Sequence, residues 1–315
     1  MKEIEVSILI PSFNGGELFI KCLEALYRQE TDTPFEVIVI DSGSTDGTAE
    51  RVKEFPLRFY EIKPGEFNHG ETRNNGIGLA KGEFVILLTQ DALPRDRHLI
   101  EALIKPLIND PLAAGVYARQ LPREDAHPLT KRDLNGWLTG GMERHVSSIS
   151  DREAYDKMRP MEKYFFCNFD DVCSAVRVSV WKKIPYTRTD FAEDLEWSKK
   201  VLEAGFKIIY EPAAAVIHSH NRSLGYEYKR TRLCHRRLNE IFGLRTVSTK
   251  TQLLRYAVKS TIKDTAYIWS EEPVFLRRIF FILRVPFSSL VKLYAQYSGA
   301  LDAITGRENN NIRGV

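Results

Sequence analysis

Short polar segments follow three apolar runs of the chain at the point where each run ends. These segments are residues 11–14, residues 41–47 and residues 90–91. If the runs are parallel strands of one sheet, their carboxyl ends meet at one edge, where open α/β sheets bind ligands. One such segment alone is typical of a turn or a helix cap, because Asp, Ser and Gly favour both. Three segments at one edge indicate a ligand crevice.

Two further groups of ionisable side chains lie later in the chain. Glu193 and Asp194 form an acid pair at the expected start of a helix, and His218 and His220 follow, His218 lying 24 residues after Asp194. On a strand the two histidines would share a face. The alternatives are ordinary ones, because acids are common at helix N-termini and a lone histidine is commonly a core or surface residue.

The elements that position these residues alternate along the chain. Continuous apolar runs separated by amphipathic segments predict βαβ units, and hence an α/β fold with a doubly wound, mostly parallel sheet sandwiched by helices. Residues 121–171 are rich in turn signals and are expected to be irregular, as a lid or acceptor-binding loops. Strands are expected at residues 6–11, 35–41, 59–63, 84–89, 114–120, 172–177 and 208–211, and helices at 17–29, 48–55, 71–80, 98–109 and 194–204.

The segments IPSFNGG, VIVIDSGSTDGT and ETRNNGIGLAKGEFVILLTQDA resemble family 2 glycosyltransferases of the GT-A fold. The later FAEDLEWSKKVLEAG and residues 218–220 extend the resemblance, which covers about residues 4–222. PGEFNHGETRN and TQDA resemble the bacterial rhamnosyltransferase branch in particular. The resemblance implies an inverting enzyme that moves a sugar, preferably L-rhamnose from dTDP-L-rhamnose, to a saccharide acceptor. A lipid-linked acceptor in cell-surface polysaccharide synthesis is expected.

The resemblance also implies a set of residues around the nucleotide-sugar. Asp41 is expected to contact the base, beside the backbone of Pro11 and Ser12, and the alternative is a helix cap. Arg73 is expected at the nucleotide or diphosphate, since guanidinium binds phosphate, and the alternative is a solvated helix arginine. The complete expected set is Pro11, Ser12, Asp41, Ser44, His69, Arg73 and Gln90.

The acidic motif that such enzymes carry after the fourth strand is altered in this sequence. Gln90 stands where a first acid is expected, and Asp91 remains as the single carboxylate. The resemblance implies that Asp91 and His218, favoured over His220, hold a divalent cation, Mn²⁺ or Mg²⁺, that bridges the diphosphate. The Gln90 amide suggests a deoxyribose, as in a dTDP-sugar.

In the resembled family the acid pair is catalytic, which makes Asp194 the general base, and Glu193 is expected to orient the acceptor or the helix. A helix N-terminus lowers the proton affinity of a carboxylate, whereas a base needs it raised, so partial desolvation is expected to offset the dipole. Asn168, Asp170 and Asp171 precede a strand and either contact acceptor hydroxyls or form a turn.

Charge divides the chain into an acidic body and a basic C-terminal part. Residues 1–221 hold 28 Lys and Arg against 35 Asp and Glu, a net charge of −7, and residues 222–315 hold 17 against 7, a net charge of +10. We therefore expect a catalytic domain over residues 1–222 and a helical basic region over 223–315. Basic side chains repeat every four residues at Arg255, Lys259 and Lys263. This region is expected to contact a membrane surface or to pack on protein, including a second copy in a homo-oligomer.

The cysteines and the hydropathy of the chain bear on where in the cell the protein is expected. Four cysteines without a CxxC pair indicate reduced thiols, and the first residues are too short and too acidic for a signal peptide. No run reaches about 18 apolar residues, because Arg277, Arg278, Arg284 and Pro286 interrupt the longest one. We therefore expect a cytoplasmic protein, peripheral on the inner face of the cell membrane, that does not cross it and binds no nucleic acid. Residues 308–315 are expected to fray.

Two other functions are compatible with parts of the pattern. A sugar-nucleotidyltransferase also uses a doubly wound sheet and a metal, but residues 12–16 lack the basic side chains it needs after the first strand. A non-catalytic membrane-associated scaffold would explain the lost acid before Asp91.

Overall fold

The structure is a computed structural model that describes residues 5–307, so the fraying expected for 308–315 falls outside the described residues. The chain divides into two compact units. Unit 1 comprises Met1–Arg123, Leu134–Lys157 and Phe165–His218, and unit 2 comprises Glu124–Asp133, Met158–Tyr164 and Ser219–Val315. The main boundary lies after His218, four residues before the predicted one. Two short segments of the region expected to be irregular belong to unit 2.

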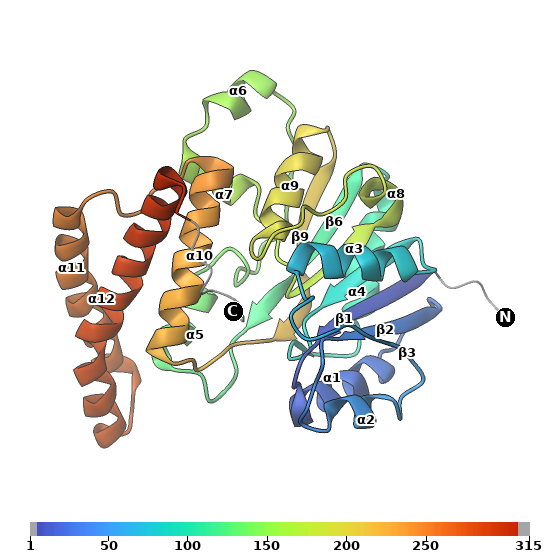
Figure 1. Ribbon diagram of the computed structural model, residues 1–315, viewed down its shortest axis with the longest axis horizontal. Helices are drawn as coiled ribbons and strands as arrows, with labels where there is room; N and C mark the ends of the chain where they lie inside the picture. The colour runs from blue at the N-terminus through green and yellow to red at the C-terminus, as the bar shows by residue number, and fades with distance from the viewer. Residues whose placement is uncertain (1–4, 308–315) are drawn as a thin grey trace. The chain divides into compact units, whose positions relative to one another are not determined.

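Unit 1 is built on a nine-stranded sheet, seen as arrows in Figure 1. The strand order is β3-β2-β1-β4-β8-β6-β9-β5, and β7 pairs with β9. The expected α/β architecture is confirmed. The strands are β1 (Val6–Ser12), β2 (Phe35–Asp41), β3 (Arg58–Glu61), β4 (Phe84–Leu88), β5 (Leu93–Pro94), β6 (Ala113–Leu121), β7 (His145–Ser147), β8 (Cys173–Arg177) and β9 (Lys207–Ile217).

The sheet is parallel in its first half and mixed in its second. β1 pairs in parallel with β2 and β4, and β2 with β3. β8 runs antiparallel to both β4 and β6, whereas β6 and β9 are parallel. β8 is buried on both faces, as the parallel strands of this sheet are, so its apolar pattern does not reveal that it runs antiparallel. The parallel half brings Ser12 opposite Asp41, which places two of the polar segments at one edge.

Helices cover both faces of this sheet because its strands alternate apolar side chains between the two faces. Ile8 and Ile10 join a core with α1 and α4, while Leu9 faces α3, where a methyl on Gly76 would collide with it. The helices that position the site are α1 (Gly16–Tyr27), α2 (Thr48–Val52), α3 (His69–Leu79), α4 (Leu99–Asn109) and α9 (Glu193–Glu203). Shorter helices of unit 1 are α6 (Arg152–Lys157) and α8 (Val178–Trp181), whereas α5 (Pro128–Asn135) and α7 (Pro160–Phe166) lie mostly in the two short segments of unit 2.

The last strand differs from its prediction. β9 continues through Pro212 and ends at Ile217, with a register shift against β6. His218 and His220 therefore lie just beyond the strand and not on it, so the expectation that they share a strand face is wrong. The four cysteines, all within the described residues, are free, as expected.

Unit 2 consists mainly of three long helices, and its helical character is the one that the basic pattern predicts. They are α10 (Leu224–Phe242), α11 (Lys250–Glu271) and α12 (Phe275–Thr305), and α12 packs on both of the others (Figure 1). Arg232 donates from Nε and Nη2 to the buried carboxylate of Asp302, at 2.6 and 3.0 Å, which ties α10 to α12. Gly299 permits this close approach, because a Cβ there would collide with the Arg232 carbonyl.

The prediction that no segment is long and apolar enough to span a membrane is wrong. Among the described residues one helix, α12, meets that test by length and composition. Pro286 does not interrupt it, because α12 continues through this residue. Only 22% of its most apolar stretch is buried.

Candidate active site

The carboxyl ends of β1 and β2 form one polar rim. The Ser12 hydroxyl donates to Asp41 Oδ1 at 2.8 Å, and the Ser42 amide donates to the Ser12 carbonyl at 2.9 Å. Pro11 lies opposite Ile40 in the same ladder. Just beyond β1, Asn14 adopts a positive φ of 48°, which a non-glycine residue adopts at some energetic cost. The strand ends predicted to gather at one edge do so.

Asp41 is turned inward at this rim. Its side chain belongs to a residue with 1% exposure, and its Oδ2 accepts from the amides of Gly43 and Ser44 at 3.0 and 2.7 Å. The Ser44 hydroxyl donates to its Oδ1 at 2.6 Å. As it lies, the carboxylate holds the turn after β2. It does not cap the following helix, which is the alternative expected for Asp41, because the N-cap of α2 is Gly47. Contact of Asp41 and Ser44 with a nucleotide base stays a prediction.

Gln90 binds the backbone of the neighbouring loop. Its Oε1 accepts from the Phe13 amide at 3.0 Å, and its Nε2 donates to the Phe13 carbonyl at 2.9 Å. A Cβ on Gly15 would collide with this amide. An ionised carboxylate has no donor for the carbonyl of Phe13. Gln90 therefore joins the β1 and β4 loops, a role that an acid at this position cannot fill. Its predicted place beside a deoxyribose stays a prediction.

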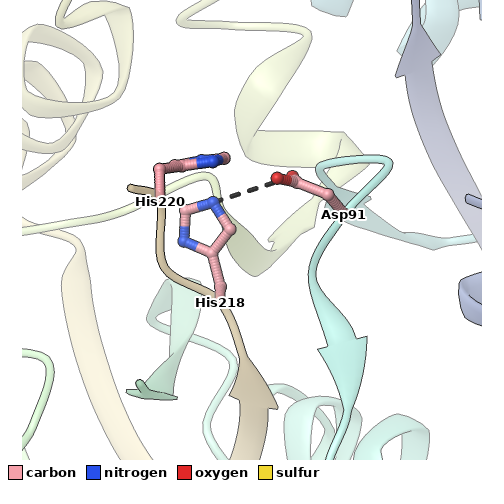
Figure 2. A group of neighbouring side chains, drawn as sticks. All are labelled: Asp91, His218 and His220. Atoms are coloured by element: carbon pink, nitrogen blue, oxygen red, sulfur yellow. Dashed lines mark ion pairs between the residues drawn. The ribbon is translucent and has the colours of Figure 1, made fainter. Parts of the chain in front are cut away.

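Asp91 and His218 lie together, with His218 Nε2 at 3.6 Å from Asp91 Oδ1 (Figure 2). Both are largely enclosed, at 19% and 13% side-chain exposure. His220 also offers a ring nitrogen, and the three ligand atoms lie within 4.8 Å of one another. A carboxylate oxygen and imidazole nitrogens at this spacing are a donor set that suits Mn²⁺ better than Ca²⁺.

The other nitrogen of His218 is held by a relay of side chains. Gln120 Oε1 lies 3.1 Å from His218 Nδ1, and Gln120 Nε2 donates to Asp170 Oδ2 at 2.7 Å. Because Asp170 accepts, Gln120 must present its carbonyl oxygen to the histidine, and His218 must carry its proton on Nδ1. The lone pair of Nε2 then faces Asp91. The residues present therefore fit a bound cation, with the supporting contacts usual around metal-binding histidines.

Arg123 is a site residue that the sequence analysis missed. Its Nη2 donates to the Asp91 carbonyl at 2.9 Å and lies 3.7 Å from Asp91 Oδ2. It follows β6 by two residues, so the strand-end argument applied to residues 113–121 would have found it. Gln120, on the same strand, carried no signal of its own, because its role depends on its spatial neighbours.

Glu193 and Arg73 form a buried ion pair at the N-terminus of α9. Arg73 Nη1 donates to Glu193 Oε1, and Arg73 Nε lies 3.1 Å from Asp171 Oδ2. His69 Nδ1 lies 3.8 Å from the same Glu193 oxygen. Arg73 is only 7% exposed, and its acidic neighbours raise its pKa although burial opposes this. The guanidinium is thus committed to two carboxylates, and its predicted contact with phosphate stays a prediction.

Asp194 lies beside this pair, with backbone donors on both oxygens. The Leu195 amide donates to Oδ1 at 2.7 Å and the Asp171 amide to Oδ2 at 3.3 Å. Burial raises the pKa of Asp194 well above its usual range, and the negative charges of Glu193 and Asp171 raise it further. Desolvation therefore outweighs the helix N-terminus, as a general base requires. The preceding residue, Ala192, adopts a positive φ of 58°.

A chain of contacts within unit 1 links the predicted residues. It runs from Asp41 through Ser12 and the adjoining Phe13 to Gln90, next to Asp91. From Asp91 it continues through His218, Gln120 and Asp170 to the adjoining Asp171, whose amide binds Asp194. His69 and Arg73 join it at Glu193. Residues spread over more than 170 positions are thus brought into one continuous polar layer.

A family model that matches this chain and two proteins similar to it are all named as glycosyltransferases. A family model described as "Glycosyl transferase family 2" matches residues 7–183. The O-antigen chain rhamnosyltransferase WbaN of Salmonella anatum is 33% identical over 227 residues, which cover 71% of this chain and 69% of that protein. The O-antigen chain rhamnosyltransferase RfbN of Salmonella typhimurium is 34% identical over 233 residues, covering 72% and 70%.

Solved structures share the fold at low sequence identity. The mannosyltransferase PcManGT from Pyrobaculum calidifontis, in complex with GDP-Man and Mn²⁺, is similar with a TM-score of 0.61 and 17% identity. The alignment covers 96% of this chain and 88% of that one. Staphylococcus aureus TarS 1-349, in complex with UDP-GlcNAc, gives a TM-score of 0.51 and 14% identity over 97% and 93%. The GT-A-like fold is therefore shown.

Proposed function

The chain belongs to glycosyl transferase family 2 and is a glycosyltransferase, and from this premise we propose that it is an inverting rhamnosyltransferase. The proposed donor is dTDP-L-rhamnose, and the proposed acceptor is a lipid-linked saccharide in polysaccharide assembly. Two relatives at 33% and 34% identity are named O-antigen chain rhamnosyltransferases, which supports this donor and acceptor class.

The observation that carries the reaction is the environment of Asp194. Its oxygens accept from two backbone amides, which fix the carboxylate, and burial raises its pKa. In the proposed reaction Asp194 accepts the proton of an acceptor hydroxyl as that oxygen bonds to the anomeric carbon. The bond from the anomeric carbon to the diphosphate oxygen breaks on the opposite side, and the electron pair leaves with the nucleoside diphosphate. The sugar is transferred in one displacement, without a covalent enzyme intermediate.

The proposed cofactor is Mn²⁺, with Mg²⁺ as the alternative. Asp91 and His218 would hold it, and the similar mannosyltransferase structure contains Mn²⁺. Such a cation, when bound, supplies positive charge that stabilises a leaving diphosphate. Arg123, beside Asp91, adds a fixed positive charge at the same place. Gln120 and Asp170 hold the Nδ1 side of His218, which leaves its Nε2 on the side of Asp91, where the metal would bind.

Glu193 is proposed to act through Arg73. Arg73 and Glu193 form an ion pair at the N-terminus of α9. The positive charge of Arg73 is therefore held there without a counter-ion from solvent. This arrangement keeps Asp194 next to a positive charge, which opposes the effect of burial and keeps its pKa from rising further.

A donor screen with the purified full chain tests the proposal. Release of nucleoside diphosphate is measured for dTDP-L-rhamnose, UDP-glucose and GDP-mannose, with Mn²⁺ and with a chelator, in the presence of a lipid-linked saccharide extract. We expect dTDP-L-rhamnose to be preferred and the chelator to suppress release. Preference for another donor would overturn the rhamnose assignment. Inorganic diphosphate as the product would indicate a nucleotidyltransferase, and no turnover with any donor would favour the scaffold alternative.

A further inference from the structure

Helix α12 carries an uncovered row of large apolar side chains. They recur at spacings of three and four residues, which places them on one side of the helix. Leu276 is 78% exposed, and Leu283 and Phe287 are each 67% exposed. The row consists of Leu276, Phe280, Leu283, Phe287, Leu290 and Tyr294.

The opposite side of α12 is the packed one. Val285, Ser289 and Ala295 are buried, at positions that α12 turns toward its neighbours in unit 2. Helix α12 is thus well packed on one side, so loose packing does not explain the exposed apolar row on the other side. Among residues 5–307, nothing covers it. Monomeric soluble proteins rarely expose an apolar surface of this extent, which marks it as a contact surface.

Helix α11 repeats the pattern and adds basic residues. Leu254, Val258 and Ile262 are all more than half exposed, and Trp269 follows near the end of the helix. Each of the first three is followed directly by an exposed basic residue, namely Arg255, Lys259 and Lys263. Apolar and basic side chains that alternate around one exposed surface are typical of helices that lie in a membrane interface.

The placement of acids decides between a membrane and a second copy of the chain. In α12 the single acid is Asp302, which is buried and bound by Arg232. In α11 Asp264 is buried and bound by Arg132, so Glu271 is the one exposed acid of these two helices. A two-fold contact between copies would bring basic surface against basic surface, without carboxylates to pair with it.

We propose that the α11–α12 pair docks on an anionic phospholipid bilayer, with its apolar rows in the boundary between headgroups and acyl chains. Basic side chains bind lipid phosphates electrostatically, and the apolar rows add hydrophobic burial. Helix α12 is proposed to lie along the surface and not to span the bilayer. A spanning helix needs apolar side chains all round, whereas α12 carries an exposed charge at Arg284, about a third of the way along it, and packs one side on protein. The inference goes beyond sugar transfer and does not depend on it.

Vesicle co-sedimentation of the purified full chain tests this inference. The chain is mixed with vesicles of phosphatidylcholine alone or of phosphatidylcholine with phosphatidylglycerol, because the anionic headgroups create the negative surface potential that attracts basic side chains. The first variant carries Leu276→Gln, Leu283→Gln and Phe287→Gln, and its matched control carries Ile108→Gln and Leu112→Gln on exposed apolar positions of unit 1. The second variant carries Arg255→Gln, Lys259→Gln and Lys263→Gln, matched by Lys182→Gln and Lys183→Gln.

We expect the unmodified chain and both controls to bind the anionic vesicles, and to bind neutral ones at least tenfold less. Both test variants should lose binding by more than tenfold while keeping the circular dichroism spectrum. An alkaline carbonate wash should release the bound chain. Equal binding by the charge variant and the unmodified chain would overturn the inference, as would failure to bind anionic vesicles. Resistance to the wash would indicate a spanning helix, and a dimer that the apolar variant dissociates, without vesicle binding, would indicate a second copy.

Discussion

The carboxylates of the candidate site in unit 1 form two groups, which differ in burial and in the positive charges that lie beside them. Asp171 and Glu193 are almost fully buried, and Arg73 binds both of them. Asp91 is more open, and it faces His218 and the guanidinium of Arg123 across 3.6 and 3.7 Å. The charges of the first group are neutralised within the protein, whereas the second group includes potential ligand atoms that lie within 4.8 Å of one another.

This difference separates a structural role from a ligand role. A buried charge must be neutralised by the fold, so removing its partner costs stability directly. The more open Asp91–His218 pair can be neutralised by solvent or by a bound cation, so its removal should cost binding and little stability. Asp194 stands between the two, because it neighbours the buried group yet is proposed to meet the acceptor.

The largest effect on catalysis is expected from Asp194→Asn. An amide cannot accept the acceptor proton, so kcat should fall by about 10²–10⁴-fold, the range for loss of a general base. The free energy of unfolding should stay the same or rise, because like charges around this position are removed. Glu203→Gln, at the other end of α9, is the control and should keep kcat. Unchanged turnover in Asp194→Asn would remove the base assignment.

The largest effect on stability is expected from Arg73→Met. It leaves Asp171 and Glu193 buried without their partner, which costs about 3–5 kcal/mol in comparable buried pairs. Urea unfolding measures the change. Arg188→Met breaks an exposed pair with Glu71 and should cost a small fraction of this. Similar losses in both variants would show that burial does not distinguish the two kinds of pair. If Arg73→Met does not fold, Arg73→Lys gives a milder version of the same comparison.

At the more open pair, Asp91 and His218, we expect a smaller effect, on metal binding and not on stability. Asp91→Asn and His218→Ala should each weaken Mn²⁺ binding, measured by calorimetry on the folded chain, while leaving urea unfolding nearly unchanged. Gln120→Leu should weaken Mn²⁺ binding by about 10–100-fold, because His218 loses the partner that fixes its proton. His220→Ala, compared with His218→Ala, identifies the histidine that binds more strongly. Undiminished binding in Asp91→Asn would place the metal elsewhere.

The smallest effect expected is a pH dependence. A raised pKa in the folded state means that Asp194 keeps its proton where the unfolded chain has lost it. Its contribution to stability is therefore present below the ordinary aspartate pKa of about 3.8 and is lost as pH rises through the raised value. The stability advantage of Asp194→Asn over the unmodified chain should grow with pH across this window, and the kcat of the unmodified chain should fall as pH drops below the raised value, because the base is then protonated. A constant advantage from pH 4 to 8, roughly the span in which such groups titrate, would show that this pKa is not raised.

The amino-acid sequence by itself determined the architecture and the positions of the chemical groups along it. Apolar runs and amphipathic segments give strands and helices because backbone periodicity is a local property. Parallel strands end at a common edge, so the polar residues near Asp41 and Asp91 could be placed together before any coordinates. The basic helical pattern after residue 222 predicted for the same reason that this region is helical, but not how many helices it forms.

Only the tertiary structure decided what each polar group binds. Arg73 pairs with Glu193, 120 positions away, and Gln90 binds the backbone of Phe13, 77 positions away. Gln120 and Arg123 carry no motif, yet they set the proton of His218 and the charge beside Asp91. Hydrogen bonds and ion pairs act over a few ångströms in space, and sequence spacing does not encode which distant side chains come within that range.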